Sequence, residues 1–363
     1  MFGFEPSEDQ KTLVESVRRF AARELRPASR AADESGEPAE RWTQAGWELA
    51  LLAASLPEEH GGFGQRSVVT GALFCEELGW GDAAGALAVL APSLVALPVL
   101  LGGTAEQKAE ILPAFAGDAY AAGSAAWQEP CFDFDPRALN TQARRENGSY
   151  LLDGVKCNVP YAAESEWMVV YAAVDGATQP FLVRKGSAGL QVKERERNMG
   201  LRALPLYSVE LKECRVPAGA RIGGDKGCDV EPILNASRVA QSALAVGVAR
   251  AAYEYALDYA KTRQAFGEMI AQRQAIAFML AEMATEIESA RLLVWEAAWR
   301  LDEDADATRE ACLAKSFVDD MALAVTDRAV QVLGGHGYIA DHPVEMWLRN
   351  GRGFGVLEGL ALV

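Results

Sequence analysis

The fold is decided by the stretch that begins with Y-A-K-T-R-Q-A-F-G-E-M-I at Tyr259–Ile270 and ends with A-V-Q-V-L-G-G-H-G-Y at Ala329–Tyr338. Between these segments, hydrophobic residues recur every three or four positions over residues 276–301 and again over residues 308–333. This spacing brings the hydrophobic side chains to one face of an α-helix. The stretch therefore predicts two long amphipathic helices, bounded by an Arg-Gln-x-Phe-Gly turn and a Gly-Gly-x-Gly turn.

Size and charge restrict the classes of function. The chain has 363 residues, enough for two or three domains, and half of them are hydrophobic. Its 35 basic and 51 acidic residues give a formal net charge of −16 at pH 7. This charge argues against a nucleic acid or an anionic membrane as a partner. A soluble enzyme whose anionic ligands are bound by a few local arginines is expected instead.

Cysteine and histidine usage indicates the compartment and the type of site. The six cysteines are scattered without a C-x-x-C pair, which predicts reduced thiols and a cytoplasmic location. With only three histidines, no metal site is expected. The start of the chain lacks the apolar stretch of a signal peptide. Residues 83–101 approach the length of a membrane span, but Pro92 and Pro98 interrupt them, which favours a buried helix or helix pair.

The predicted elements follow the order helices, strands, helices. A first helix is expected to be capped at Ser7 and to end at Pro27, with a second around Ala39–Leu52. Short, partly alternating segments separated by glycine turns predict strands at Tyr150–Val155, Trp167–Ala173, Pro180–Val183, Leu190–Lys193 and Tyr207–Leu211. We predict an α+β protein with an N-terminal all-α domain (1–120), a middle antiparallel β domain (121–230, a small barrel or sandwich) and a C-terminal helical domain (231–363). The order of elements, without G-x-G-x-x-G after a strand, argues against a Rossmann domain.

Several motifs, in order along nearly the whole chain, resemble the acyl-CoA dehydrogenase family of flavoproteins. They are L-P-E-E-H-G-G-F-G (56–64), E-P (129–130), M-G-L-R (199–202), C-R-V-P (214–217), Y-A-K-T-R-Q-A-F-G (259–267), Q-A-I-A-F-M-L-A-E-M (274–283), Q-V-L-G-G-H-G-Y (331–338) and H-P-V-E (342–345). The resemblance implies a C-terminal four-helix bundle and an FAD cofactor. It implies dehydrogenation of an acyl-CoA or acyl-carrier thioester, with an electron-transferring flavoprotein as the electron acceptor. An α-proton acidified by a thioester requires a positioned carboxylate, and the flavin accepts the β-hydride.

The family's catalytic glutamate lies in an aromatic-Glu-Gly-Thr run, which corresponds to V-L-E-G-L at Val356–Leu360. Glu358 is therefore the predicted base, and the preceding H-P-V-E-M-W-L-R-N-G-R run supports this register. The alternative is a surface glutamate near the end of the chain. Arg238 matches a family position associated with the thioester pocket, and its alternative is a helix-start arginine in a salt bridge.

Two further segments resemble those that contact the FAD of a neighbouring subunit. Arg263, Gln264 and Phe266 form the first, and an arginine fork suits a pyrophosphate. Gln331, Gly334 and Gly335 belong to the second, where small residues permit close backbone approach. The alternatives are a surface arginine beside a core phenylalanine, and an ordinary glycine C-cap. A shared flavin requires at least a dimer, so a homodimer, a homotetramer or a heteromer with a homologous subunit is expected.

The resemblance is weakest at the flavin ring. Q-E-P-C-F-D-F-D (128–135) stands where the family has Thr-Glu-Pro-Gly-x-Gly-Ser-Asp, so Gln128 replaces a small hydroxyl residue. K-C-N-V-P-Y (156–161) stands where the family has Lys-x-Trp/Phe-Ile-Thr-Asn, so Asn158 replaces an aromatic residue. Leu357 and Leu360 flank the predicted base in place of an aromatic residue and a threonine, and no counterpart of the family's final helix follows Val363.

Three functions stay open at this point. The first is a working FAD-dependent acyl-CoA dehydrogenase with an atypical flavin pocket. The second is a catalytically degenerate partner subunit that completes the active site of another chain. The third is a non-redox thioester-binding or structural protein of this fold.

Overall fold

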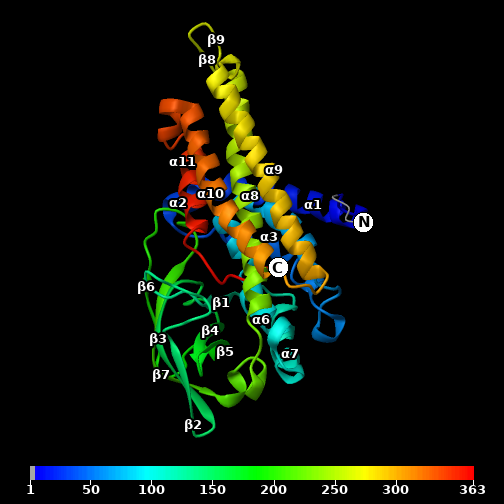
Figure 1. Ribbon diagram of the computed structural model, residues 1–363, viewed down its shortest axis with the longest axis vertical. Coiled ribbons are helices and arrows are strands. Elements are labelled where there is room, and N and C mark those ends of the chain that lie inside the picture. The colour runs from blue at the N-terminus through cyan, green and yellow to red at the C-terminus, as the bar shows by residue number, and fades with distance from the viewer. Residues whose placement is uncertain (1–4) are drawn as a thin grey trace.

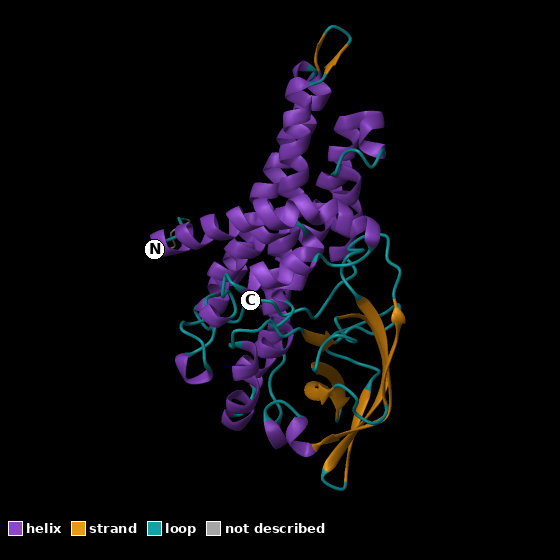
Figure 2. Cartoon of the chain, turned by 180° about the vertical axis from the view of Figure 1, so that it is seen from behind, coloured by secondary structure: helices purple, strands orange, loops and turns teal. Residues whose placement is uncertain are grey.

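The computed structural model describes residues 5–363 and consists of a helical region and a β region (Figure 1). Helices occupy the chain to residue 115, the strands of the large sheet lie within residues 123–217, and helices return from residue 231. The N-terminal and C-terminal helices pack together, and the sheet lies beside them (Figure 2). The predicted α+β fold is confirmed. The domain boundaries at residues 120 and 230 fall in the connections and remain our proposal.

The N-terminal helices are α1 (Glu8–Phe20), α2 (Arg26–Ser35), α3 (Glu40–Trp47), α4 (Val68–Gly81), α5 (Ala83–Leu90), α6 (Ser93–Gly102) and α7 (Ala105–Ile111). The cap predicted at Ser7 is confirmed, because Ser7 and Gln10 exchange side-chain to backbone hydrogen bonds in a capping box. The predicted stop at Pro27 is wrong. The chain continues through a π-helical turn at Ala21–Leu25 into α2, and Pro27 lies in the first turn of α2, where no backbone donor is needed.

The hydrophobic stretch over residues 83–101 is a bent pair of buried helices, α5 and α6, which meet at 51°. Within residues 5–363, no single helix is long and apolar enough to cross a membrane, and only this bent pair could do so by length and composition. The helix predicted over residues 39–52 is shorter than expected. It ends as α3 at Trp47, and Ala50 then adopts a left-handed φ of 52°.

The β region is a seven-stranded sheet with the order β1-β4-β2-β3-β7-β6, and β5 pairs with β4. Its strands are β1 (Gly123–Ala126), β2 (Gln142–Glu146), β3 (Ser149–Pro160), β4 (Trp167–Val174), β5 (Ala177–Arg184), β6 (Leu190–Arg195) and β7 (Leu206–Pro217). The five predicted strands correspond to β3–β7. The sequence did not predict β1, which has four small buried residues, or β2, which is polar and largely exposed. These two strands run parallel to β4, whereas the other pairs are antiparallel.

The C-terminal helices are α8 (Glu231–Thr262), α9 (Gln274–Asp302), α10 (Thr308–Leu333) and α11 (Val344–Phe354). The two long helices expected from the sequence are confirmed as α9 and α10. They pack against α8, and α4 from the N-terminal part packs against both α8 and α9. The small hairpin of β8 (Gln264–Ala265) and β9 (Glu268–Met269) projects from the end of the bundle that is remote from the sheet (Figure 1).

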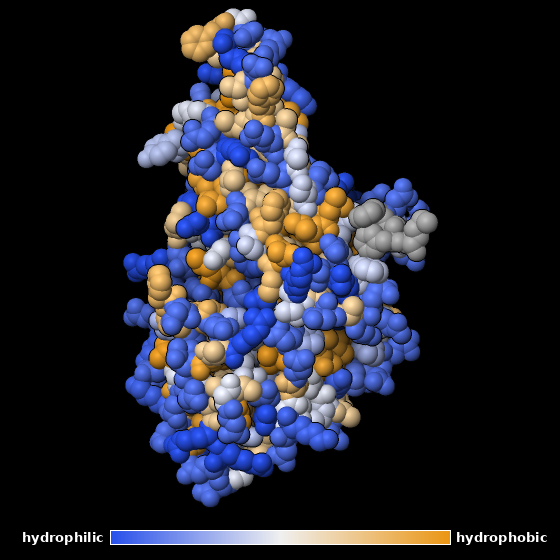
Figure 3. Space-filling view, viewed as in Figure 1, coloured by the Kyte–Doolittle hydropathy of each residue, from blue (hydrophilic) through white to orange (hydrophobic). Residues whose placement is uncertain are grey.

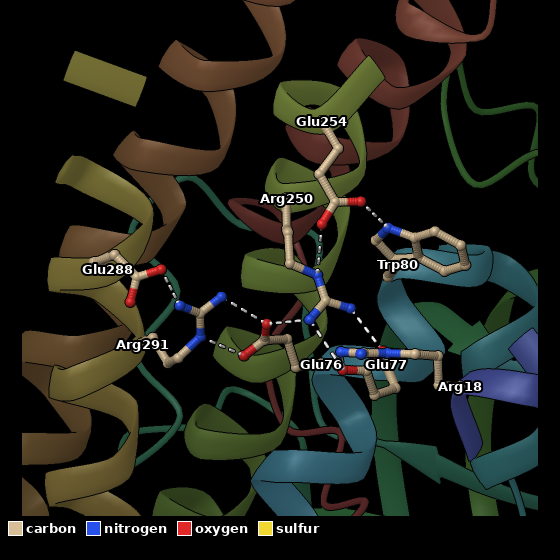
Figure 4. Close-up of polar contacts among 8 residues, drawn as sticks. All are labelled: Arg18, Glu76, Glu77, Trp80, Arg250, Glu254, Glu288 and Arg291. Carbon is tan, nitrogen blue, oxygen red and sulfur yellow. Dashed lines mark hydrogen bonds and ion pairs between the residues drawn. The ribbon is translucent and has the colours of Figure 1, made fainter. Parts of the chain in front are cut away.

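A partly buried network of charged side chains joins four helices of the bundle (Figure 4). Glu77 of α4 accepts hydrogen bonds from Arg18 of α1 and from Arg250 of α8, at 2.7–3.0 Å. The neighbouring Glu76 accepts from Arg250 and from Arg291 of α9. Burial alone would raise the pKa of Glu77, but the hydrogen bonds and charges of Arg18 and Arg250 hold it below its usual value. The network therefore ties α1, α4, α8 and α9 together.

Residues 355–363 follow α11 without forming a regular element, and most of those from Leu357 onward are buried. Leu357, Leu360 and Leu362 are each at most 3% exposed. The Nη2 atom of Arg66 donates to the backbone oxygen of Val363 at 2.8 Å. This segment carries Glu358, so packing and hydrogen bonding on both sides fix the backbone of the predicted base.

Candidate active site

Glu358 lies beside the beginning of α8. Its Oε1 accepts a hydrogen bond from Nε of Arg238 at 3.1 Å. The side chains of Arg238 and Glu358 are 10% and 19% exposed, so the pair is largely shielded and the carboxylate keeps an accessible edge. Arg238 is thus a helix-start arginine in a salt bridge, as one interpretation of the sequence expected, and its partner is the predicted base itself.

Side chains of α10 lie near this pair. Nη1 of Arg238 donates to Sγ of Cys312 at 2.9 Å. One turn further along α10, Lys315 binds Asp319 with an N–O distance of 2.5 Å. Burial raises the pKa of Asp319 against the opposing effect of Lys315, and the charge of Glu358 adds to the rise. The sequence did not indicate these α10 residues, because only the fold brings them near residue 358.

The backbone at Gly359 determines where the Glu358 side chain lies. Gly359 has a φ of +79°, and a Cβ atom added there would lie 2.6 Å from Cβ of Trp127. Trp127 is held in turn, since its ring stacks on Tyr171 with centroids 3.7 Å apart and its Nε1 donates to the Pro136 backbone oxygen. Only glycine combines this conformation with so close an approach. The Glu-Gly sequence is therefore required to hold the carboxylate at Arg238.

The structure brings Gln128 and Asn158 together. Nδ2 of Asn158 donates to Oε1 of Gln128 at 3.2 Å, and Nε2 of Gln128 donates to the backbone oxygen of Val356 at 2.8 Å. These bonds connect β3 to the segment that carries Glu358. Asn158 has a φ of 51° and lies at an irregularity in the β3–β7 pairing. A left-handed backbone accepts asparagine far more readily than an aromatic residue, which accounts for Asn158 at this position.

A buried ion pair lies beneath the same segments. Nζ of Lys156 binds Glu129 at 2.8 Å, and the two side chains are 0% and 3% exposed. Glu129 also accepts from the backbone N–H groups of Asn140 and Thr141. Burial lowers the pKa of Lys156 to about 8, although Glu129 opposes this. The pair fixes the two segments Gln128–Asp135 and Lys156–Tyr161 to each other.

A hollow of about 240 Å³ opens between the sheet and α11, beside Asn158. Its apolar wall includes Leu201, Leu206 and Leu357. A more open cleft of about 630 Å³ adjoins it, and Arg349 lines both. The cleft is also lined by Arg195, Arg197, Arg202, Glu37, Glu194 and Glu196. The hollow suits a flat, apolar ring with a polar edge, and the cleft leaves room for a polar extension of that ring.

Arg263, Gln264 and Phe266 lie at the opposite end of α8, on and beside the β8–β9 hairpin. The 24 residues of α8 that follow Arg238 extend about 36 Å at 1.5 Å per residue. All three side chains are exposed, and Phe266 is 94% exposed. They therefore cannot belong to the same site as Glu358 within one chain.

Gln331, Gly334 and Gly335 lie at this same remote end. They terminate α10, and His336 of the following turn contacts Tyr259 of α8 with ring centroids 6.2 Å apart. A Cβ atom added at Gly334 or Gly335 would meet no atom within 4 Å. Packing within the chain does not require these glycines, although Gly334 ends α10 with a φ of +58° that favours glycine, and both leave open space beside them. The structure thus divides the predicted residues into one set around Glu358 and another at the remote end.

Comparison with known proteins identifies the family. Three domain models match: the N-terminal domain of acyl-CoA dehydrogenase over residues 7–118, the middle domain over residues 124–214 and the C-terminal domain over residues 229–361. The probable acyl-CoA dehydrogenase FadE25 of Mycobacterium tuberculosis is 33% identical over 365 residues, which cover 98% of this chain and 93% of that protein.

Solved structures agree with this family. Butyryl-CoA dehydrogenase from Megasphaera elsdenii matches with a TM-score of 0.90 and 28% identity, covering 99% of this chain and 97% of that one. A glutaryl-CoA dehydrogenase from Mycobacterium smegmatis, in complex with FADH2, matches with a TM-score of 0.88 and 26% identity, covering 98% and 92%. The chain belongs to the acyl-CoA dehydrogenase family. It is an oxidoreductase of the class that acts on the CH–CH group of acyl thioesters with FAD as cofactor.

Proposed function

We propose that this chain is a working dehydrogenase that forms the α,β double bond of an acyl thioester, with Glu358 as the catalytic base. The observation that carries the proposal is the Arg238–Glu358 pair at 3.1 Å, shielded and rigidly held by Gly359 against Trp127. A rigid carboxylate with one accessible edge is suited to take a proton from a bound substrate.

The residues of this chain perform the proton half of the reaction. Glu358 accepts the α-proton of the thioester, and Arg238 orients the carboxylate by its hydrogen bond to Oε1. Cys312 holds the other side of the Arg238 guanidinium, which restricts its rotation. FAD, when bound, supplies the acceptor for the β-hydride.

We propose that the flavin ring is held in the hollow beside Asn158. The hollow has the apolar wall that a flavin ring requires, and the side chains of Gln128 and Asn158 supply polar groups next to it. These residues replace the hydroxyl and aromatic groups of the usual family pattern, so the flavin pocket is atypical. The buried Lys156–Glu129 pair keeps both altered segments in position.

A second subunit completes the flavin site in this proposal. Arg263, Gln264 and Phe266 reach the flavin of a neighbouring subunit, and Gln331, Gly334 and Gly335 allow its close approach. Three observations support this arrangement. These residues lie far from Glu358, the side chain of Phe266 is exposed, and both glycines adjoin open space. Hydrophobic side chains also gather over the bundle on one face of the molecule (Figure 3), and exposed members lie on α9 and α10. A homodimer, a homotetramer or a heteromer of homologous subunits would cover such surfaces.

The remaining assignments follow from the family. The thioester carrier is coenzyme A or an acyl carrier protein, and an electron-transferring flavoprotein accepts the electrons. All six cysteines are free thiols, which is consistent with a reducing, cytoplasmic setting. Fatty acid metabolism is the setting that this chemistry suggests.

A second candidate function is a partner subunit that lacks its own flavin. The altered segments Gln128–Asp135 and Lys156–Tyr161 favour it, because Asn158 of the second segment lines the hollow and binds Gln128 of the first. The Arg263–Phe266 turn offered to a neighbour keeps the family pattern. Flavin content separates the candidates. The purified chain is expected to be yellow, with about one FAD per chain, and a saturated acyl-CoA is expected to bleach it without oxygen. A colourless protein that gains flavin only with a co-expressed homologue would favour the partner subunit, and no flavin in any pairing would leave a non-redox protein.

A further inference from the structure

The first half of α10 presents three polar side chains on the side of the helix that meets the Arg238–Glu358 pair. Cys312, Lys315 and Asp319 are spaced three and four residues apart, so they lie along one face of the helix. Sγ of Cys312 accepts from Arg238 at 2.9 Å, which places this face next to the residue that holds Glu358. In the proposed reaction Arg238 and Cys312 orient the base, whereas the other two residues of this face have no part.

Lys315 connects α10 to the backbone that leads to the base. It is only 7% exposed, and its Nζ binds Oδ2 of Asp319 at 2.5 Å and donates to the backbone oxygen of Phe354 at 2.9 Å. Phe354 is the last residue of α11 and lies four residues before Glu358. A buried ammonium group is costly unless it is paired and hydrogen-bonded, so both bonds are expected to persist. They hold the end of α11 against α10.

The negative charge of Asp319 acts on the candidate base. Lys315 binds one oxygen of Asp319, whereas the other, Oδ1, is buried and has no hydrogen-bond partner among residues 5–363. Burial raises the pKa of Asp319, Lys315 opposes the rise, and the charge of Glu358 adds to it. Because the interaction of two charges is mutual, Asp319 also disfavours the ionised form of Glu358. A carboxylate that binds a proton more tightly is a stronger base.

Titratable and charged side chains from three parts of the chain lie around Glu358: Arg238 of α8; Cys312, Lys315 and Asp319 of α10; and Arg137 before β2, which interacts with Cys312. Arg137 is also engaged by Glu231, with N–O distances of 2.6 and 2.8 Å. Within this set Asp319 is the one carboxylate, and Lys315 is the cation bound to it. Substitution of Asp319 therefore leaves an uncompensated positive charge near the base.

We propose that Lys315 and Asp319 are positioning residues for the catalytic base: Lys315 fixes the backbone before Glu358, and Asp319 offsets the positive charge of Lys315, which keeps Glu358 a strong base. The inference rests on the proposed function and gives the α10 pair a part in its proton transfer. Without Asp319, the positive charge of Lys315 would stabilise the ionised carboxylate of Glu358 and weaken it as a base. Removal of both charges would restore the balance, which a purely structural pair would not do.

The pH dependence of flavin reduction tests the proposal. Stopped-flow absorbance follows the anaerobic reduction of the FAD-loaded protein by a saturated acyl-CoA from about pH 5 to about pH 9. Asp319→Asn, which keeps the side-chain size, is expected to lower the pH of half-maximal rate by about 0.5 unit or more. The double variant Lys315→Met with Asp319→Asn is expected to return this pH towards the wild-type value, and Asp319→Glu, which keeps the charge, to stay close to it. Asp327→Asn removes an exposed carboxylate from the same helix and is the control.

A second measurement does not depend on turnover. The carboxyl of Glu358 is titrated by 13C NMR in protein labelled at the δ-carbon of glutamate, and its resonance is assigned by its loss in Glu358→Gln. Asp319→Asn is expected to lower the midpoint of this titration by the same amount. An unchanged midpoint, or a shift that persists in full in the double variant, would overturn the proposal. A shift in a protein that does not reduce its flavin would refute the redox function and leave the charge effect of Asp319 standing.

Discussion

Nε of Arg238 and Oε1 of Glu358 lie 3.1 Å apart, although 120 residues separate them in the sequence. One residue comes from the buried beginning of α8 and the other from the irregular segment after α11. The pair therefore exists only when the C-terminal segment is correctly packed against the bundle. Folding and the geometry of the candidate base are coupled through this single contact.

Substitution of Arg238 is expected to impair the reaction without emptying the flavin site. Arg238→Gln removes the charged donor that orients Glu358, and a hydrogen bond to a charged group is worth about 1.5–3 kcal/mol. The rate of anaerobic flavin reduction is expected to fall roughly 10- to 100-fold. Stopped-flow absorbance measures this rate. Arg145→Gln, which breaks the exposed pair with Asp225, is the control, and equal rates in the two variants would refute the role of Arg238.

Substitution of Asn158 tests whether the backbone conformation explains the asparagine at this position. Because Asn158 has a φ of 51°, Asn158→Trp is expected to destabilise the protein by about 1–2 kcal/mol, whereas Asn158→Gly is expected to be nearly neutral. Denaturant unfolding monitored by fluorescence measures the difference. Val155→Trp, at an exposed position of the same strand, controls for the bulk of tryptophan. An Asn158→Trp variant as stable as this control would contradict the explanation.

The charged network of the bundle predicts a loss of stability in acid. The folded pKa of Glu77 lies below its unfolded value of 4.5, so the unfolded state binds more protons as the pH falls. The contribution of Glu77 is present above pH 4.5 and is lost as the pH falls through the folded pKa. At pH 7, Glu77→Gln is expected to cost about 3–5 kcal/mol, because Arg18 and Arg250 lose a charged partner.

The free energy of unfolding, measured from pH 7 to pH 3, checks this expectation. The difference between wild type and Glu77→Gln is expected to shrink towards pH 3. Glu288→Gln is the matched control, since Glu288 is 66% exposed at the edge of the same network, and a cost within about 0.5 kcal/mol is expected. A pH-independent difference for Glu77→Gln would exclude an ionised Glu77 as the source of stability.

Arg263 tests the sharing of flavin between subunits. Arg263→Ala is expected to weaken FAD retention roughly 10- to 100-fold, because a charged donor to the pyrophosphate is lost. The bound FAD after gel filtration measures retention. Lys261→Ala, an exposed cation in the last turn of α8, is the control. Normal flavin content in Arg263→Ala would refute the proposed contact.

Much of the fold could be predicted from the sequence, because helical spacing and glycine turns are local signals. The spacing over residues 276–301 and 308–333 gave α9 and α10 directly. The wrong prediction at Pro27 also has a local cause. The sequence alone does not distinguish a proline that ends one helix from a proline in the first turn of the next. Strand β2 was missed because its polar, exposed residues give no hydrophobic alternation.

The candidate site could be predicted less completely. Motif register pointed to Glu358 and Arg238 separately, but no local pattern relates residue 358 to residue 238 or to Cys312. Long-range contacts of this kind are fixed by tertiary structure, which a single sequence specifies only indirectly.

In the proposed reaction, Glu358 removes the α-proton of a bound acyl thioester. The most direct measurement is the flavin absorbance of wild type and Glu358→Gln when a saturated acyl-CoA is added without oxygen. The glutamine keeps the size of the side chain and can still accept from Arg238, so FAD is expected to remain bound. The wild type is expected to bleach within seconds, and the variant is expected to stay yellow. Bleaching of Glu358→Gln at the wild-type rate would contradict the account.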